Sequence, residues 1–245
     1  MNSNTPASKI ALVFGGSRGI GAGIALRLAQ EGANVALTYA SAAASAHEVV
    51  AAIERQGRQA LAIQADSGND VDLQSAVRQT VERFGRIDIV VVSAGVLHIA
   101  DVAEFSIDNL DRMLDVNVRG VYLSIKAALP HMGKGGRIVT IGSNAAERTS
   151  HPGSSVYSMT KGAVAVMVKG LAVDLAPRGI NINNIQPGPI ATDMTASMLE
   201  MITPLIPLKR VGQPAEIGGL VAYLTGPDAG YMTGASLTID GGMSL

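Results

Sequence analysis

Short apolar runs alternate with longer stretches of helical period along the chain from Lys9 onward. The apolar runs predict strands at 9–15, 33–39, 59–65, 87–95, 136–143, 179–188 and 235–240. The stretches between them predict helices near 20–31, 42–56, 69–84, 107–131, 155–176 and 214–225. Strands that alternate with helices are typical of βαβ units, whose right-handed crossovers place helices on both faces of a parallel sheet. The pattern therefore predicts an α/β fold, a Rossmann-type doubly wound parallel sheet of about seven strands.

Residues 9–245 are predicted to form one domain, because the composition has no linker-like break, low-complexity tract or repeat. The polar residues 1–8 precede the first apolar run and are expected to form a loose tail. The segment 189–213 is rich in Pro, Met and Thr and has no regular pattern. A long irregular stretch in a compact α/β domain is more often a lid or binding loop, so we expect this segment to be a substrate loop.

The composition excludes several classes of function. With 47% apolar, 3% aromatic and 16% charged residues, the core has to consist mainly of Ala, Val, Ile and Leu, which suits buried parallel strands. The formal net charge of −1 and the scarcity of aromatic residues disfavour a nucleic-acid binder. The chain has no Cys, and its four His residues are never four positions apart, so no metal site is expected.

The composition also bears on location. The N-terminal residues lack the apolar core of a signal peptide. No apolar stretch is expected to reach the ~18 residues that a membrane span needs. The lack of Cys fits a reducing compartment. We therefore expect a cytoplasmic protein without a membrane partner.

A glycine-rich turn, residues 15–21, joins the first predicted strand to the first predicted helix. Gly15 can turn the strand sharply, Gly19 lets the backbone approach a pyrophosphate, and Gly21 lets helix and strand pack closely. Free N–H groups at the start of a helix favour an anion there. The spacing G-x-x-x-G-x-G differs from the G-x-G-x-x-G of many dinucleotide folds, so a tight turn that binds nothing stays open as an alternative.

The same turn matches the G-x-S-x-G nucleophile elbow of α/β-hydrolases, with Ser17 as the nucleophile. Such an elbow normally follows a central strand, after an earlier loop that supplies the donors of the oxyanion hole. Ser17 follows the first predicted strand, so this sequence offers no earlier loop for those donors. The hydrolase alternative is therefore disfavoured.

Tyr157 and Lys161 lie four residues apart in the predicted helix 155–176 and therefore share one face. A tyrosine has a pKa of about 10, and a neighbouring ammonium lowers that pKa by stabilising the phenolate. This pairing is one way to obtain an acid/base catalyst near neutral pH. Ser143 ends the predicted strand 136–143, and the carboxyl ends of such strands are where open α/β sheets bind ligands.

These pieces, in this order, resemble the short-chain dehydrogenase/reductase family over residues 9–242. Two positions depart from the usual pattern of the family, since Phe14 stands where Thr is common and Ser93 where Asn is common. The departures affect local hydrogen bonds rather than the fold. The matching pieces are the 15–21 turn, Asp66, Ser93-Ala94-Gly95, Asn117, Ser143, Tyr157, Lys161, Pro187-Gly188 and Asp240-Gly241-Gly242.

The resemblance implies a catalytic tetrad and a dinucleotide cofactor. Tyr157 would donate a proton to a carbonyl or remove one from an alcohol, and Lys161 would lower the pKa of Tyr157 and bind the nicotinamide ribose. Ser143 would hold the carbonyl oxygen, and Asn117 would support a water in a proton relay to Lys161. The implied cofactor-binding residues are Gly15, Ser17, Arg18, Gly19, Ile20, Gly21, Tyr39, Ala40, Ser41, Asp66, Ser67, Ser93, Ala94, Gly95, Tyr157, Lys161, Pro187, Gly188, Ile190 and Thr192.

The residues after the second predicted strand favour NADP(H) over NAD(H). In dinucleotide folds that prefer NAD, an acidic residue near this point binds the ribose 2′-OH. Here the strand continues into Tyr39, Ala40 and Ser41, which carry no carboxylate. Arg18 in the glycine turn is placed to meet a 2′-phosphate, and Ser41 could add a hydrogen bond.

The main expectation is an NADPH-dependent reductase that acts on a small-molecule ketone or aldehyde, or oxidises the corresponding alcohol. One alternative is a 3-oxoacyl-thioester (acyl-carrier-protein) reductase, because Lys134 and Arg178 occupy positions that are basic in some such reductases. Another is a regulatory protein on the same fold that binds a signalling nucleotide. The sequence offers no code for the substrate.

A homotetramer is expected, partly because the family commonly associates through two long helices and the last strand. The predicted helix 155–176 is apolar on almost every side, so it needs a second surface to bury against. The run 235–240 would form an edge strand, which natural proteins rarely leave bare. Two-fold association at both surfaces would give D₂ symmetry.

Overall fold

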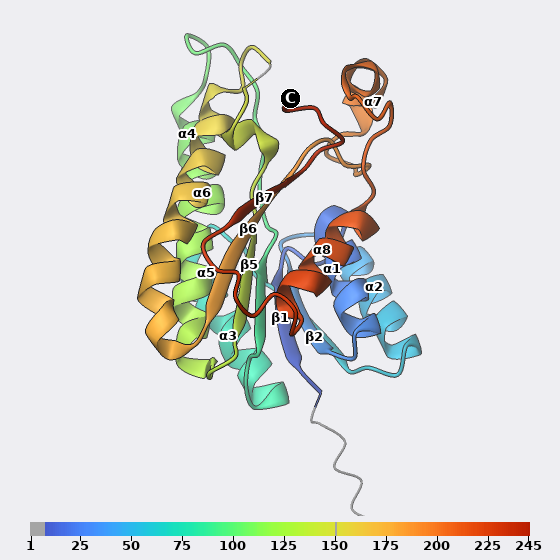
Figure 1. The fold of residues 1–245 in the computed structure, drawn as a ribbon, viewed down its shortest axis with the longest axis vertical. Coiled ribbons are helices and arrows are strands. Elements are labelled where there is room, and N and C mark those ends of the chain that lie inside the picture. Colours follow the sequence, from blue (N-terminus) through green and yellow to red (C-terminus); the bar gives the residue numbers. More distant parts are fainter. Residues whose placement is uncertain (1–7, 150) are drawn as a thin grey trace, which may run out of the picture.

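A computed structural model describes residues 8–149 and 151–245 of the chain (Figure 1). Of the tail predicted at residues 1–8, all but Ser8 lies outside the described residues. Seven parallel strands form one sheet in the order β3-β2-β1-β4-β5-β6-β7. They are β1 (Ile10–Phe14), β2 (Asn34–Tyr39), β3 (Ala60–Gln64), β4 (Ile89–Val92), β5 (Arg137–Ile141), β6 (Asn181–Pro187) and β7 (Ser236–Ile239).

The strand order reverses beside β1. The chain moves outward from β1 through β2 to β3, and then returns to place β4 on the other side of β1. The connections after β1 and β4 therefore diverge to opposite faces of the sheet and leave a crevice at the carboxyl ends of these strands. The predicted fold class, a doubly wound parallel sheet, is confirmed.

Helices cover both faces of the sheet (Figure 1). The helices α1, α2 and α8 bury their apolar residues on one face, and α3, α5 and α6 on the other. The bounds are α1 (Gly19–Gln30), α2 (Ala43–Arg55), α3 (Asp70–Phe84), α4 (Ile107–Leu114), α5 (Gly120–Ala128), α6 (Ser155–Leu175), α7 (Leu199–Ile202) and α8 (Pro214–Thr225).

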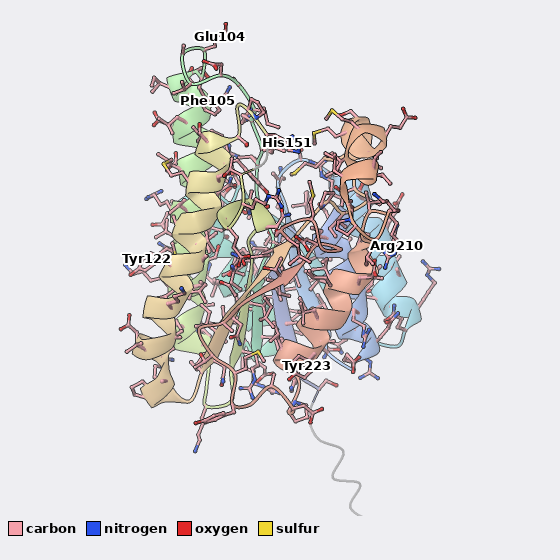
Figure 2. The ribbon with its side chains drawn as sticks, turned by 45° about the horizontal axis from the view of Figure 1, so that its top comes forward. Glu104, Phe105, Tyr122, His151, Arg210 and Tyr223 are labelled. Carbon is pink, nitrogen blue, oxygen red and sulfur yellow. The ribbon has the colours of Figure 1, made fainter. Side chains whose placement is uncertain are left out.

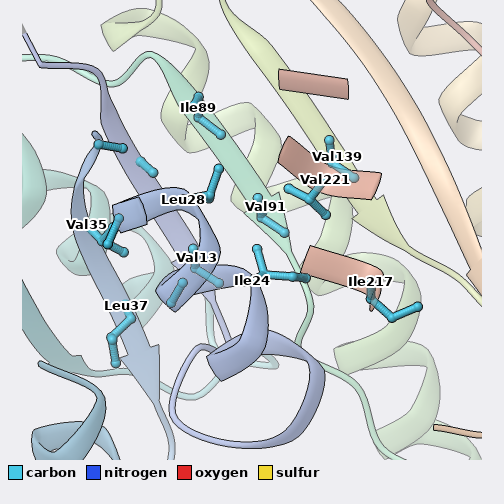
Figure 3. Close-up of a cluster of buried hydrophobic side chains, with 14 of the residues drawn as sticks. Val13, Ile24, Leu28, Val35, Leu37, Ile89, Val91, Val139, Ile217 and Val221 are labelled. Atoms are coloured by element: carbon cyan, nitrogen blue, oxygen red, sulfur yellow. The ribbon is translucent and has the colours of Figure 1, made fainter. Parts of the chain in front are cut away.

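The central strands feed two separate cores because successive strand residues point to opposite faces. In β1, Val13 packs with α1 and α8, whereas Leu12 and Phe14 pack on the opposite side. Figure 3 shows the first core, in which Val13 lies with Ile24 of α1 and Ile217 of α8. A strand that is buried on both faces reads as a continuous apolar run, which is why the pattern identified these strands.

Two predicted segments differ in detail from the structure. The helix predicted at 107–131 is a continuous helical run, but its middle, Asp115–Arg119, is a π-helix between α4 and α5, and its end, Leu129–His131, is a 3₁₀ turn. π segments are rare in proteins, and those that occur often lie at functional sites. This one contains Asn117. The segment predicted as irregular, 189–213, holds the short helix α7 and two 3₁₀ turns.

The expectation that no apolar stretch approaches the length of a membrane span is wrong for one helix. By length and composition alone, Ser155–Arg178 could cross a bilayer, and it is the one such helix in the described part of the chain. Here α6 lies against β6 and buries Thr160, Lys161 and Val164. A helix that packs on a sheet can pass the same test, so one such helix is weak evidence for a membrane span.

The contact between α5 and the loop after β3 should tolerate no side chain at Gly120. An added Cβ there would lie 2.1 Å from the Ser67 carbonyl oxygen. We expect Gly120→Ala to lower the free energy of unfolding by about 2–3 kcal/mol. The matched control is Gly170→Ala in α6, where a Cβ meets nothing within 4 Å. This variant should raise the free energy of unfolding by about 0.5–1 kcal/mol, because Ala favours a helix more than Gly does. Urea unfolding of both variants measures this, and equal effects would contradict the packing argument.

Candidate active site

A cavity of about 440 Å³ opens at the carboxyl ends of β1, β4 and β5. The loops at this end of the molecule carry Glu104, Phe105 and His151 (Figure 2). The lining residues are Gly15, Ser17–Gly21, Thr38–Ala40, Ala65–Ser67, Ser93–Val96, Arg112, Val116, Ile141, Gly142, Tyr157, Lys161 and Thr192–Met194. The cavity therefore lies in the crevice that the strand order creates, and most of the predicted cofactor residues line it.

The glycine turn is packed too closely for side chains at two of its positions. Gly15 has φ of 76°, in the left-handed region, and an added Cβ would lie 2.7 Å from the Ala94 backbone. A Cβ on Gly21 would lie 2.0 Å from the Gly15 carbonyl oxygen. Thr38 of β2 holds the turn, because its Oγ1 accepts from Gly15 N–H at 2.9 Å and its carbonyl from Gly16 N–H at 3.0 Å. These contacts hold the turn in place, although Phe14 stands where the resembling family commonly has Thr.

The start of α1 is suited to an anion. Arg18 is the N-cap residue, with an extended backbone, and it makes no side-chain hydrogen bond to the first turn of the helix. The first turn contains no acidic residue. The N–H groups at this end and the positive end of the helix dipole therefore face the cavity without an internal partner, as a bound pyrophosphate requires.

Lys161 is nearly fully buried, with 5% of its surface exposed. Its Nζ donates to the carbonyl oxygen of Ile141, the last residue of β5, at 3.0 Å. An ammonium has three donors, and this is the one hydrogen bond of Nζ within the described residues. The remaining donors are available to hydroxyl groups of a ligand in the cavity. Burial lowers the pKa of Lys161 from 10.5 to about 8.

Tyr157 lies between Lys161 and Ser143. The Lys161 Nζ is 5.6 Å from the centre of the Tyr157 ring, and the Ser143 side chain lies near enough to the phenol to affect its pKa. Burial raises the pKa of Tyr157, and the nearby Ser143 side chain only partly opposes this. Burial therefore dominates the pKa of this phenol, and a lowering of that pKa by Lys161, whose Nζ donates to Ile141, stays a prediction.

Asn117 uses its whole side-chain amide to hold neighbouring segments. Its Oδ1 accepts from Val96 N–H at 2.9 Å, and its Nδ2 donates to the Val96 carbonyl at 2.8 Å and to Thr160 Oγ1 at 3.3 Å. The loop after β4 is thereby joined to α6 next to Tyr157 and Lys161. This geometry gives the Asn117 side chain a positioning role, and the proposed support of a water stays a prediction.

Some predicted cofactor residues lie outside the cavity lining. Ser41 is exposed one residue beyond Ala40. Ile190 is buried in the α1/α8 core, and Gly188 packs against Asp240, where a Cβ would lie 2.5 Å from the Asp240 Cβ. Pro187, buried in β6, is also absent from the lining, as are the tetrad residues Asn117 and Ser143, which contact residues that do line it. The other predicted cofactor residues all line the cavity.

Sequence reasoning missed several lining residues. Asp193 and Met194 follow Thr192 in the predicted substrate loop, so that prediction could have been extended to them. Arg112 is different, because it comes from α4 and no local motif marks it. The other missed residues are Thr38, Ala65, Val96, Val116, Ile141 and Gly142.

An exposed ion pair connects the glycine turn to the segment 189–213, the predicted substrate loop. Arg18 Nη1 lies 3.9 Å from Asp193 Oδ2, and both side chains are mostly exposed. Such a pair contributes little to stability and is readily exchanged for another anion. The Arg18 guanidinium is therefore available to a phosphate group at the mouth of the cavity.

These features together fit a nicotinamide dinucleotide. The glycine turn lines the cavity in a tight conformation that admits no side chain at Gly15 or Gly21, and the start of α1 carries no side-chain cap and no acidic residue, which suits an anion. Lys161 has donors left for ribose hydroxyls, and Tyr157 lies at the same end of the cavity. The residues that would hold the cofactor are thus the glycine turn in the middle and Lys161 at the reacting end.

Comparison with known proteins agrees with this geometry. Residues 15–244 match the family model described as enoyl-(acyl carrier protein) reductase. The chain is 41% identical to the cyclic-di-GMP-binding biofilm dispersal mediator protein of Escherichia coli K12, with 95% of this chain and 96% of that protein covered. It is 39% identical to the 3-oxoacyl-[acyl-carrier-protein] reductase of Synechocystis, with 97% and 98% covered.

Solved structures are similar over almost the whole chain. A short-chain dehydrogenase/reductase from Serratia marcescens is 51% identical, with a TM-score of 0.94 and 97% of this chain and 98% of that chain covered. A short-chain dehydrogenase from Burkholderia cenocepacia in complex with NADP is 43% identical, with the same TM-score and coverage. The blue fluorescent protein from a metagenomic library, in complex with NADPH, is 42% identical, with a TM-score of 0.93 and coverage of 97% and 98%.

The buried Lys161 should lower the stability of the protein at neutral pH. Below about pH 8 the folded protein has to hold a buried ammonium, whereas between about pH 8 and 10.5 only the unfolded chain still binds that proton. Stability therefore rises with pH across this window. We expect Lys161→Met to stabilise the protein by about 1–3 kcal/mol at pH 7, and by less at pH 10.

Urea unfolding at the two pH values measures this effect. The matched control is Lys169→Met, because Lys169 is exposed on the same helix and its removal should have a small effect that does not depend on pH. A Lys161→Met variant that is less stable than the parent at pH 7 would contradict the assignment.

Proposed function

The chain belongs to the short-chain dehydrogenase/reductase family, and on this basis we propose that it is an NADPH-dependent oxidoreductase. It would reduce a small-molecule ketone or aldehyde, or oxidise the corresponding alcohol. The observation that carries the proposal is the arrangement of Tyr157, Ser143 and Lys161 at one end of a cavity whose middle is the glycine turn. Relatives crystallised with NADP and NADPH support the choice of cofactor.

Each side chain of the site would have its own role in the reduction. Bound NADPH would supply the hydride. Tyr157 would give its phenolic proton to the carbonyl oxygen, and its raised pKa keeps that proton in place at neutral pH. Ser143, whose side chain lies near the Tyr157 phenol, would hold the same oxygen. Lys161 would bind ribose hydroxyls through the donors that Ile141 leaves free. In the reverse direction, Tyr157 would have to lose its proton first, so alcohol oxidation requires alkaline pH.

The preference for NADPH rests on the residues at the mouth of the cavity. Tyr39 and Ala40 line it without a carboxylate, and Arg18 lines the same cavity. A charge-assisted contact between the guanidinium and a 2′-phosphate is worth about 1.5–3 kcal/mol. The exposed partner of Arg18, Asp193, is the group that a phosphate would replace.

The acyl-carrier-protein alternative draws support from the family description and from the Synechocystis relative. Arg178, however, donates to the carbonyl oxygens of Leu129 and Met132 at 2.7 and 3.1 Å. Both Lys134 and Arg178 precede strands, whereas the catalytic residues follow them. Within one subunit the two basic residues thus belong to the edge of the sheet away from the cavity, which weakens their case as docking residues for a carrier protein.

The signal-nucleotide alternative draws support from the name of the E. coli relative. Turnover separates it from the main proposal. Consumption of NADPH with members of a ketone panel supports the enzyme. Tight binding of cyclic di-GMP without turnover of any carbonyl substrate would favour the regulator.

We also propose a homotetramer. On α6, Val166 and Val173 are 67% and 74% exposed, and Tyr122 of α5 projects from the same side of the molecule (Figure 2). The strand β7 has a neighbour on one side only. A cytoplasmic location stays a prediction, to be tested by cell fractionation.

Tyr157→Phe should abolish nearly all turnover while NADPH still binds. The ring and its packing remain, and only the hydroxyl that gives the proton is lost. Steady-state kinetics and cofactor titration measure the two properties. The matched control, Tyr231→Phe, alters a fully exposed tyrosine and should keep full activity. Substantial turnover by Tyr157→Phe would overturn the proposed mechanism.

Arg18→Ala should reduce the preference for NADPH over NADH by roughly tenfold to a hundredfold. The measured quantity is the ratio of kcat/KM for the two cofactors. Arg55→Ala is the control, because Arg55 is exposed at the end of α2. A parent protein that prefers NADH, or an unchanged ratio in Arg18→Ala, would refute the assignment of Arg18.

Light scattering at micromolar concentration should give four times the chain mass of 25.2 kDa. An exposed charge on α6, introduced as Val173→Glu, should dissociate the assembly without unfolding the subunit. A parent of 25.2 kDa would refute the assembly, and a stable dimer would leave only one of its two interfaces.

A further inference from the structure

Met194 places a thioether at the wall of the cavity. It follows Thr192 and Asp193 in the segment 189–213, and all three residues line the cavity. Met194 is also 50% exposed. A methionine in such a place serves as an adaptable apolar surface, but its sulfur is also oxidised by a reagent that can reach it. The reduction proposed above gives this sulfur no role.

The turn that carries Met194 is held at both ends. The Ala191 N–H donates to the Gly212 carbonyl at 2.9 Å, which closes the base of the segment. The Thr192 N–H donates to Thr195 Oγ1 at 3.2 Å, and the Thr195 N–H donates to the Thr192 carbonyl at 3.1 Å. These bonds span the positions on either side of Met194, so its backbone has a defined place at the cavity wall.

The same turn lies next to the glycine-rich turn at the start of α1. An added Cβ on Gly19 would lie 3.1 Å from Thr192 Cγ2, and Arg18 Nη1 is 3.9 Å from Asp193 Oδ2. A dinucleotide bound along the glycine-rich turn would therefore lie beside Met194. Because a ligand covers the surface of the residues that it contacts, an occupied cavity should hinder the access of a reagent to this sulfur.

The other sulfur groups of the chain provide the comparison. The chain contains no Cys, whose thiolate is the other side-chain group that peroxides oxidise. Met113 and Met132 are buried. Met159 of α6 is 50% exposed, as Met194 is, and Met201 of α7 is 63% exposed, but neither belongs to the lining of the cavity. Met194 therefore differs from its exposed counterparts in position rather than in exposure.

We propose that Met194 is an oxidation site through which hydrogen peroxide lowers the activity of the enzyme. The sulfur gives an electron pair to one oxygen of the peroxide, and the O–O bond breaks. The other oxygen leaves as water, with the proton that the transferred oxygen carried. Sulfur is thereby oxidised by two electrons to the sulfoxide, and the peroxide is reduced by two.

The sulfoxide changes the wall of the cavity from apolar to polar. A polar oxygen that a bound ligand covers loses its water, and without a new hydrogen bond this loss weakens binding. Oxidation thus acts against occupancy of the cavity, and occupancy acts against oxidation. The inference rests on the proposed binding of NADPH and adds a means of regulating that same site.

The first test measures oxidation of each Met by mass spectrometry of its peptides after treatment with hydrogen peroxide. Met194, Met159 and Met201 should be oxidised at similar rates in the free protein, and Met113 about tenfold more slowly or less. NADP⁺, which does not reduce peroxide, should slow the oxidation of Met194 by about tenfold and leave that of Met159 unchanged.

The second test compares treated and untreated samples of the parent, Met194→Leu, Met159→Leu and Met201→Leu. Leu lacks sulfur and is close to Met in volume. The dissociation constant of NADPH and kcat/KM should together worsen by about tenfold in the treated parent and in the two control variants. Treated Met194→Leu should keep the values of its own untreated sample, and methionine sulfoxide reductase should restore the parent.

Other results would overturn the proposal. If treated Met194→Leu loses as much as the parent, the sensitive group lies elsewhere. If bound NADP⁺ does not slow the oxidation of Met194, the ligand does not cover this sulfur. A parent that binds neither NADP⁺ nor NADPH would remove the proposed function together with this inference. A parent that binds and turns over normally after complete oxidation of Met194 would remove the inference alone.

Discussion

The hydrogen bond from the buried Lys161 amine to the Ile141 carbonyl is the constraint on which the active end of the cavity depends. It joins α6 to the end of β5 and so fixes where Tyr157 stands relative to Ser143. The burial that makes this contact also sets the acid–base state of the site, because it moves the pKa of Lys161 down to about 8 and that of Tyr157 upward. A buried amine is unfavourable for folding, and the ligand binding and proton transfer proposed for this site would account for its retention.

The cavity has one rigid end and one exposed end. At the end of the cavity that Tyr157 and Lys161 line, contacts from α6 to β5 and from Asn117 in the π segment to the loop after β4 hold the side chains in place. At the mouth, Arg18 and Asp193 form an exposed pair that an anion can displace. This division suits an enzyme that must position a reacting group closely and also admit and release a large cofactor.

The fold could be predicted from the sequence because the apolar runs of the strands and the helical period of the segments between them are both visible within short stretches of chain. Strands buried on two faces read as unbroken apolar runs, and Leu12, Val13 and Phe14 show why, since neighbouring residues enter different cores. The π segment around Asn117 could not be predicted, because helical period does not distinguish it from an α-helix. In the site, Ile190 was expected at the cavity because of the family resemblance, but its side chain joins the core. Arg112 and the raised pKa of Tyr157 depend on contacts between distant segments, which no local pattern records.

The most direct test of the account is the pH dependence of kcat for ketone reduction at saturating NADPH. A Tyr157 that keeps its proton, because burial raises its pKa, predicts a rate that stays level from about pH 6 to pH 9, while alcohol oxidation increases throughout that range. A reduction rate that falls with an apparent pKa of about 7 or below would contradict the account, because it would mean that the proton donor is already ionised at neutral pH.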